Sequence, residues 1–368
     1  MKVITQLQLL LGRYFTSSYW NLECLSHIIL GLLQVNDVNL AKLAKTFSRE
    51  ASVDSCYKRL QRFMKRFTFS FDQLWLLINH TFDLTTTLYL TMDRTNWKFG
   101  KTHINFLVIG VAFNGYAIPI IWRLLPNRKR GNSTALDREE LFDCLRKFIC
   151  LKNIRSLLCD REFIDHNWLN YLIKHQIPFA IRVKLNLTVN TARGKVKVSH
   201  LFRNLKVYDV SYLKKAHNLV DCKVYLSAMR LASGELLIVA TESYNQNALD
   251  DYAVRWEIES CFSALKKRGF NLENTHLTST EKLVKIMFIA VIAFIWSYAC
   301  GELLIKTKNL KVKKHGYYCK SIIKIGIEAI GKAISRIHIN INQLVDLIYC
   351  LGETIEKQKI INQITGVL

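Results

Sequence analysis

The stretch HINFLVIGVAFNGYAIPIIWRLL, residues 103–125, decides the fold class of this chain. Two apolar runs flank Asn114-Gly115, a dipeptide typical of the two-residue turn of a β-hairpin. We therefore expect two paired strands here. Another strand is predicted just before them, in TTTLYLTMDRT at residues 85–95, because β-branched and aromatic residues favour extended backbone.

Strands and helices then alternate along the chain, which is the pattern of a mixed sheet with helices on its faces. The predicted elements are a helix in DREELFDCLRKFIC (137–150), a buried strand in IRSLLCD (154–160), a helix in FIDHNWLNYLIKHQ (163–176) and a strand in PFAIRVK (178–184). Residues from about 185 to 244 return to a β-like pattern. The fold class is therefore predicted as α/β, with a β-rich insertion.

The flanking segments have apolar residues at helical spacing. We predict three regions: a helical region at 1–80, a sheet-containing domain at 81–302 with the insertion at about 185–244, and a helical region at 303–368. The uncharged run at 286–301 is short for a membrane span, so we expect a buried helix there and no membrane partner.

The charge of the chain points to a polyanionic partner. Lysine and arginine number 52 against 29 acids among 368 residues, for a formal charge of +23. Nucleic acid is the usual partner of such a surface, and the alternative is a protein that is merely basic. The ten cysteines show no C-x-x-C spacing, so we expect reduced thiols in a cytosolic protein and no zinc site.

One predicted helix, VDSCYKRLQRFMKRF at 53–67, concentrates this charge. We expect Asp54 or Ser55 as its N-cap. Its basic residues suit a DNA-reading helix of a helical bundle, and the alternative is a solvated helix face. The candidate DNA contacts are Lys58, Arg59 and Arg62.

Acidic residues at strand ends are the candidate catalytic groups. Asp93 and Asp160 each fall at the end of a predicted strand, and adjacent strands can bring such ends together. Two aspartates and a glutamate from a following helix can hold two divalent metal ions, and hard oxygen ligands suit Mg²⁺. Glu162 could share the side of Asp160. Other acids on the predicted helices (Asp137, Asp143 and Asp165) are expected to be solvated.

The stretch YAVRWEIESCFSALKK, residues 252–267, offers two glutamates. At about 100° per residue, an α-helix places Tyr252, Arg255, Glu259 and Lys266 within a sector of about 100° and sends Glu257 roughly 160° away from Glu259. Glu259 is therefore the better candidate. The alternative is an amphipathic helix with an ordinary Arg255–Glu259 ion pair.

The spacing Tyr252-x2-Arg255-x3-Glu259-x6-Lys266 resembles the Y-R-E-K signature of bacterial insertion-sequence transposases of the insertion-sequence-four type. Further similar segments are KKRGFNLENTHLT after the signature, MDRTNWKFG around Asp93, GNS at 131–133 and CDREF around Asp160. The resemblance runs from about Asp93 to Thr278. Arg94, Asn96 and Trp97 could position the strand end or contact DNA, although Trp97 could equally serve packing.

The resemblance implies a ribonuclease-H-like catalytic domain at 81–302 with Asp93, Asp160 and Glu259 as a D-D-E triad. It implies metal-dependent hydrolysis at the element ends and transfer of the 3′-OH ends into target DNA. The implied cofactor is Mg²⁺, as two ions that Mn²⁺ can replace. Tyr252, Arg255 and Lys266 would bind phosphate, with Arg as a fork and Lys as a point charge.

The implied partners are double-stranded DNA, as element ends and target, and a second copy of the chain in a homodimer on DNA. The implied location is the bacterial cytoplasm, at the nucleoid. Two other interpretations stay open: a ribonuclease-H-like nuclease that cuts without joining, and a catalytically inactive DNA-binding repressor or remnant.

Overall fold

The structure is a computed structural model that describes residues 2–47, 51–84, 87–126, 132–191, 194–307 and 318–352. We interpret PNRKRGNS (126–133) as a basic loop, and its residues 127–131 lie outside the described residues, as do the stretches 308–317 and 353–368 of the predicted C-terminal region. The chain divides into two compact units. One comprises residues 1–85, 97–103 and 262–368, and the other comprises residues 86–96 and 104–261.

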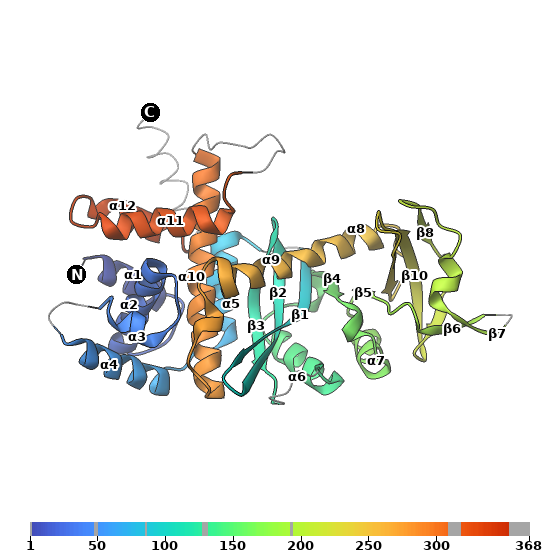
Figure 1. Cartoon of the computed structure of the whole chain (residues 1–368), viewed down its shortest axis with the longest axis horizontal. Coiled ribbons are helices and arrows are strands. Elements are labelled where there is room, and N and C mark those ends of the chain that lie inside the picture. Colours follow the sequence, from blue (N-terminus) through green and yellow to red (C-terminus); the bar gives the residue numbers. More distant parts are fainter. Residues whose placement is uncertain are drawn as a thin grey trace. The chain divides into compact units, whose positions relative to one another are not determined.

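The second unit is built on a mixed sheet of eleven strands with helices packed on it, which confirms the α/β fold class. Their order is β3-β2-β1-β4-β5-β11-β10-β9-β6-β7, with β8 paired to β10 (Figure 1). The strands are β1 (Leu88–Phe99), β2 (Thr102–Phe113), β3 (Tyr116–Leu124), β4 (Ile154–Cys159), β5 (Phe179–Arg182), β6 (Thr188–Thr191), β7 (Gly194–Lys197), β8 (Val210–Tyr212), β9 (His217–Leu219), β10 (Cys222–Arg230) and β11 (Leu236–Thr241).

The hairpin prediction is confirmed. β2 and β3 pair antiparallel from Phe113↔Tyr116, and both turn residues have positive φ, 47° at Asn114 and 92° at Gly115. This conformation is the one that an Asn-Gly turn adopts readily. β3 lies at the end of the strand order, and an edge strand tolerates Pro119 because one side of its backbone needs no ladder partner.

The strands within the predicted insertion at about 185–244 belong to the same sheet as β1 to β5. β11 pairs antiparallel with β5 and β10 pairs antiparallel with β11, whereas β1, β4 and β5 pair parallel. Without β11, β5 would be the edge strand of the sheet, with unpaired backbone N–H and C=O groups. Pairing β11 there satisfies them, a choice that no local sequence pattern encodes.

The helices α6 (Ala135–Leu145), α7 (His166–Lys174) and α8 (Ala248–Ala253) belong to this unit, as does most of α9 (Glu257–Ser263). α6 contacts β3 and α7, while α8 contacts β4, β5, β10 and β11. Between α8 and the strands lies an apolar cluster of Leu158, Ala180, Val239, Leu249 and Tyr252, with Tyr89 packed against it. This cluster fixes α8 on the sheet.

The first unit is helical, except for the tip of the β1–β2 hairpin at 97–103. Its helices are α1 (Lys2–Gly12), α2 (Tyr19–Val35), α3 (Leu40–Ala44), α4 (Val53–Arg66), α5 (Phe71–Phe82), α10 (Thr280–Thr307), α11 (Ile322–Ser335) and α12 (Ile341–Ile348). Ser52, and not Asp54 or Ser55, is the N-cap of α4: its side chain accepts a hydrogen bond from the backbone N–H of Ser55.

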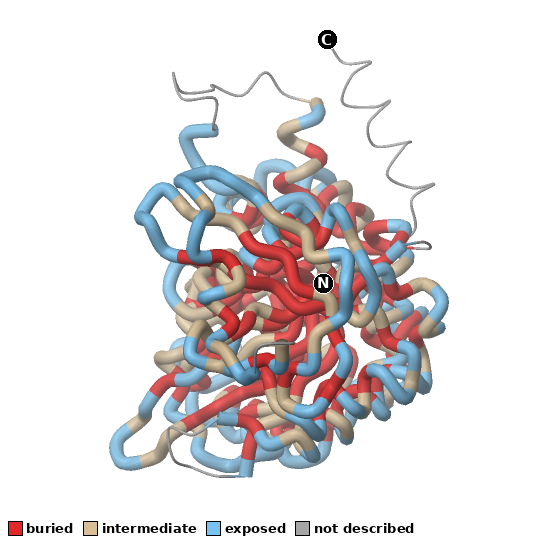
Figure 2. The backbone as a smooth tube through the Cα atoms, turned by 90° about the vertical axis from the view of Figure 1, so that its right-hand side faces the viewer, coloured by how far each residue is buried: buried red, intermediate tan, exposed pale blue. Residues whose placement is uncertain are grey.

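α10 is the central helix of this unit. It is long and apolar enough to cross a membrane, yet 94% of its most apolar window is buried within the protein, as we expected of a core helix. α11 crosses it closely (Figure 1), because Gly326 leaves room for the Ser297 carbonyl of α10, 1.8 Å from where a Cβ would stand. Figure 2 shows buried residues in continuous stretches inside and exposed residues on outer turns.

Candidate active site

The two aspartates lie side by side on neighbouring strands. β1 and β4 are parallel and their ladder ends at the pair Met92↔Cys159, so Asp93 and Asp160 are the next residues on each strand. Adjacent strands are about 4.8 Å apart, and residues in register point to the same face of the sheet. Asp93 does not end its strand as predicted, since β1 continues to Phe99; it is the first residue after the part that pairs with β4.

Both aspartates lie on the face of the sheet that α8 covers. Side chains alternate along a strand, so Asp160 shares a face with Leu158 of the apolar cluster beneath α8. Tyr252 belongs to the same cluster, and its buried hydroxyl lies 3.5 Å from Oδ1 of Asp160. Burial raises the pKa of Tyr252, so its hydroxyl keeps its proton and can donate it in a hydrogen bond.

Arg255 connects the other two carboxylates. Its Nη1 lies 3.4 Å from Oδ2 of Asp93, and its Nη2 donates to Oε1 of Glu259 at 2.8 Å. The Arg255 side chain is 5% exposed, that of Asp93 18% and that of Glu259 41%. Asp93, Asp160 and Glu259 are thus linked in one site through Arg255 and Tyr252, and Glu259 is the most open to solvent.

Two aromatic rings hold the guanidinium of Arg255. Its Cζ lies 5.7 Å from the ring centroid of Tyr252 and 5.3 Å from that of Trp256, within the range of cation–π attraction. Its Nε is buried and has no hydrogen-bond partner among the described residues. A buried donor without a partner is costly, and an acceptor brought by a ligand would satisfy it.

The stretch 252–267 is not the single regular α-helix that we predicted. α8 passes into a 3₁₀ turn (Val254–Trp256), then into α9 (Glu257–Ser263) and a π-helical turn (Ala264–Arg268). π turns occur often at functional sites. The Arg255–Glu259 pair survives because these residues are still one turn apart. Lys266 lies in the other compact unit, where its Nζ pairs with Glu273 at 2.9 Å.

Glu257 and Glu259 have different surroundings. Oε1 of Glu257 accepts a hydrogen bond from the backbone N–H of Gly115, in the turn of the β2–β3 hairpin, at 2.8 Å. Burial raises the pKa of Glu257, against the effect of this hydrogen bond. Glu257 therefore anchors its helix to the hairpin turn, while Glu259 faces Arg255.

Asp93 has an unusual charge environment. Burial raises its pKa from 3.8 to about 7, and the charges of Glu162 and Asp160 act in the same direction, while the backbone N–H of Arg94 and the guanidinium of Arg255 oppose them. With a pKa near 7, a carboxyl group is about half protonated at neutral pH, and its charged form is costly in this site. Such perturbed groups are common at functional sites.

The site fits a divalent cation in part. Carboxylate oxygens are suitable ligands, and the strand register puts Asp93 beside Asp160. Arg255, however, is paired with Asp93 and Glu259. Within the ranges that the structure describes, no group of three or more His, Cys, Asp or Glu side chains could hold a metal ion.

Neighbouring acids that sequence reasoning left aside have specific partners. Glu162 forms a two-bond ion pair with Arg94. None of the acids expected to be solvated is buried, and each also has a partner. Asp165 caps α7 and pairs with Arg138, Asp137 closes the capping box of α6, and Asp143 accepts a hydrogen bond from the hydroxyl of Tyr171. Arg138 was missed because its burial depends on contacts distant in sequence.

The candidate DNA contacts of α4 are on two faces. Lys58 and Arg62 are exposed and line a hollow of about 550 Å³ together with Ser55, Gln61, Lys65 and Lys282. Arg59 instead pairs with Glu23 at 2.8 Å and lies over the ring of Phe47. Among the residues that the structure describes, no acidic side chain lines this hollow, so its lining is positively charged, whereas the charge of Arg59 is matched by Glu23.

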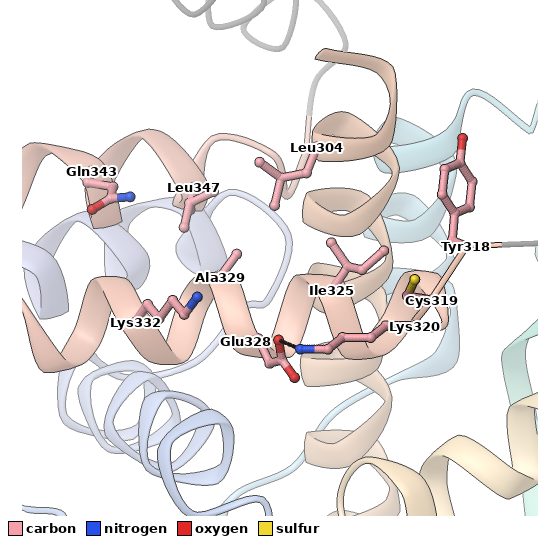
Figure 3. Close-up of a pocket in the computed structure, with 10 residues that line it drawn as sticks. All are labelled: Leu304, Tyr318, Cys319, Lys320, Ile325, Glu328, Ala329, Lys332, Gln343 and Leu347. Carbon is pink, nitrogen blue, oxygen red and sulfur yellow. Dashed lines mark hydrogen bonds and ion pairs between the residues drawn. The ribbon is translucent and has the colours of Figure 1, made fainter. Parts of the chain in front are cut away.

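Another hollow, of about 410 Å³, lies among the C-terminal helices (Figure 3). Its ionic groups include Lys320, whose Nζ lies 2.5 Å from Oε2 of Glu328. The lining is otherwise largely apolar: Leu304, Tyr318, Cys319, Ile325, Ala329, Lys332, Gln343 and Leu347 complete it. It contains none of the candidate catalytic residues.

Comparison with known proteins points to one family. The family model described as "Transposase DDE domain" matches residues 81–296, more than half of the chain. A solved structure described as a piggyBac transposase synaptic complex with hairpin DNA is similar at 12% sequence identity and a TM-score of 0.44, over 96% of this chain and 84% of that one. No curated protein matches the chain in sequence.

Proposed function

The chain belongs to the transposase DDE domain family, and we propose that it cuts DNA at the ends of a mobile element and joins the released 3′-OH ends to target DNA. The proposed catalytic residues are Asp93, Asp160 and Glu259. We further propose the insertion-sequence-four type, because Tyr252, Arg255, Glu259 and Lys266 have the spacing of its Y-R-E-K signature.

The three carboxylates are the proposed ligands of two Mg²⁺ ions, for which Mn²⁺ could substitute. Divalent ions, when bound, polarise a water and stabilise charge on the attacking and leaving oxygens at phosphorus. Arg255 would have to exchange at least part of its contact with Asp93 and Glu259 for a new partner. A DNA phosphate is such a partner, since it accepts the forked grip of a guanidinium.

The binding groups would hold the DNA end beside the carboxylates. Arg255 has a buried Nε that lacks an acceptor, and Tyr252 has a protonated hydroxyl; both can donate to phosphate oxygens. Lys266 would act as a point charge. Lys58 and Arg62 are also proposed to bind DNA, and Arg59 is the weakest of these candidates because Glu23 already pairs with it.

One observation carries the proposal: Arg255 is buried between Asp93 and Glu259, in a site where Asp160 is the register neighbour of Asp93. A surface ion pair contributes about 0–1 kcal/mol and would not require this burial. Collecting three acids around one buried arginine and one buried tyrosine is costly for stability and is understandable as a phosphate-handling site.

The test is cleavage of a labelled duplex that carries the DNA flanking the coding region. Glu259→Gln should abolish cleavage in Mg²⁺, while Glu257→Gln should keep most of it, since the amide oxygen can still accept the Gly115 N–H. Both changes preserve shape, so both proteins should fold. Normal cleavage by Glu259→Gln, or its loss only in Glu257→Gln, would refute the assignment.

A strand-joining assay separates the proposal from its alternatives. Cleaved ends that are never joined to target DNA would indicate a nuclease of the same fold. Binding of the ends without cleavage would indicate a repressor or an inactive remnant. We propose that the active form is a homodimer on DNA in the bacterial cytoplasm, and the stoichiometry of the purified complex tests the dimer.

A further inference from the structure

Arg94 and Glu162 form a forked ion pair beside the two aspartates. Nε of Arg94 lies 2.5 Å from Oε1 of Glu162, and its Nη2 lies 2.6 Å from Oε2. Nη2 also lies 3.2 Å from Oδ1 of Asn132. The side chains are 11% and 22% exposed, so water screens the pair only weakly. Two parallel bonds to one carboxylate fix orientation as well as distance.

The fork joins the two segments that carry the aspartates. Arg94 follows Asp93 on β1, and Glu162 lies two residues after Asp160, in the short 3₁₀ turn Arg161–Phe163. The backbone ladder between β1 and β4 ends at Met92↔Cys159, immediately before the two aspartates. Side chains therefore take over from the backbone in holding the two segments together.

The turn after Asp160 is tied at its other end as well. Arg138, which is buried, pairs with Asp165 and lies over the ring of Phe163, 5.2 Å from its centroid. Arg138 belongs to α6 and also bonds to Ser133. This second tie fixes the turn to α6, whereas Arg94 ties the turn to the strand of Asp93.

We propose that Arg94 and Glu162 are a positioning pair that sets the separation and orientation of Asp93 and Asp160. The inference rests on the proposed function, in which these aspartates act together. Catalytic groups must be held to within about 0.5 Å, and a displacement of about 1 Å can cost on the order of 100-fold in rate. Neither member of the pair needs to touch the DNA.

The experiment compares Arg94→Gln, Arg94→Lys and Glu162→Gln with a matched control, Arg138→Lys. The control weakens the tie from Arg138 of α6 to the same turn but leaves the link to β1 intact. For each protein, single-turnover cleavage is measured at saturating element-end duplex in Mg²⁺, with the Kd for the duplex and the thermal midpoint. Measuring at saturation separates the rate of the bound complex from binding.

Arg94→Gln and Glu162→Gln should lower the single-turnover rate by about 10- to 100-fold, the usual effect of losing a supporting partner, with little change in Kd. Arg94→Lys should recover part of the lost rate, because an ammonium keeps the charge but cannot form the fork. Arg138→Lys should lower the thermal midpoint and keep the rate. Wild-type rates in both glutamine variants, or an equal loss of rate in Arg138→Lys, would refute the proposal that Arg94 and Glu162 position the aspartates.

Amide hydrogen exchange keeps this test independent of cleavage. In the unliganded protein, Arg94→Gln and Glu162→Gln should speed exchange in peptides that cover 89–94 and 157–163, and Arg138→Lys should leave the first peptide unchanged. If the wild type cut no DNA while exchange changed as expected, the proposed function would be refuted. The role of Arg94 and Glu162 in holding the two segments together would then still be supported. Unchanged exchange in both glutamine variants would refute the pair.

Discussion

Asp93→Asn should make the metal-free protein more stable at alkaline pH, because the native site keeps Asp93 in an unfavourable charged state. Burial raises the pKa of Asp93 from 3.8 to about 7. The difference between these pKa values corresponds to about 4 kcal/mol, since one pH unit is about 1.4 kcal/mol. This free energy already includes the favourable contacts of the carboxylate with Arg94 and Arg255.

The sign of the effect follows from proton binding. Below a pH of about 4, Asp93 is protonated in both states and carries no penalty. As the pH rises from about 4 to about 7, the unfolded chain releases the proton and the folded chain retains it, so the free energy of unfolding falls. Above about pH 7 the full penalty is present. Asparagine resembles the protonated acid in shape and is never charged. The variant Asp93→Asn therefore lacks this penalty at every pH.

The assay is urea unfolding in EDTA near pH 5 and pH 8, for the wild type and Asp93→Asn, with Asp250→Asn as a control for the same change at an exposed position. The variant should gain up to about 4 kcal/mol over the wild type near pH 8 and less near pH 5. Asp250→Asn should change stability little at either pH.

Adding Mg²⁺ extends this test. A bound cation favours the ionised carboxylate, so it should stabilise the wild type near pH 8 and should not stabilise Asp93→Asn. A variant that is less stable than the wild type near pH 8, or a difference that does not change with pH, would refute the reasoning about Asp93.

Two further predictions concern the helical unit. Changing Lys58 and Arg62 together to Gln should weaken binding of element-end DNA and reduce the slope of log K against log[salt] by about 2, since each lost phosphate contact removes about 0.9. Arg59→Gln, the matched control, should leave the slope unchanged; equal slopes in all three proteins would leave the α4 face as a solvated surface. Gly326→Ala should destabilise the protein by about 1–3 kcal/mol in thermal or urea unfolding, because its Cβ would meet backbone of α10 at 1.8 Å. Gly331→Ala, whose nearest atom is 3.7 Å away, should be neutral or stabilising, and an equal loss there would contradict the packing argument.

Local sequence was sufficient for the elements and for the candidate acids. The Asn114-Gly115 hairpin, the strands before each aspartate and the apolar face of α4 depend on turn chemistry and on side-chain periodicity, which act within a few residues. The choice of Glu259 over Glu257 also began from local geometry, because residues two apart on a helical segment point to different sides. Family resemblance then identified the D-D-E spacing.

Tertiary structure decided what local patterns could not express. The 3₁₀ and π turns within 252–268 replace a regular helix, and β11 joins the sheet beside β5, because packing and strand pairing outweigh local propensity. The fork of Arg94 on Glu162 joins residues 68 positions apart, and Arg255 reaches an aspartate 162 positions away. Such partners meet only when the sheet aligns its strands. The sequence therefore offered Arg94 and Arg255 as candidates, but only the tertiary structure showed which distant acids they contact.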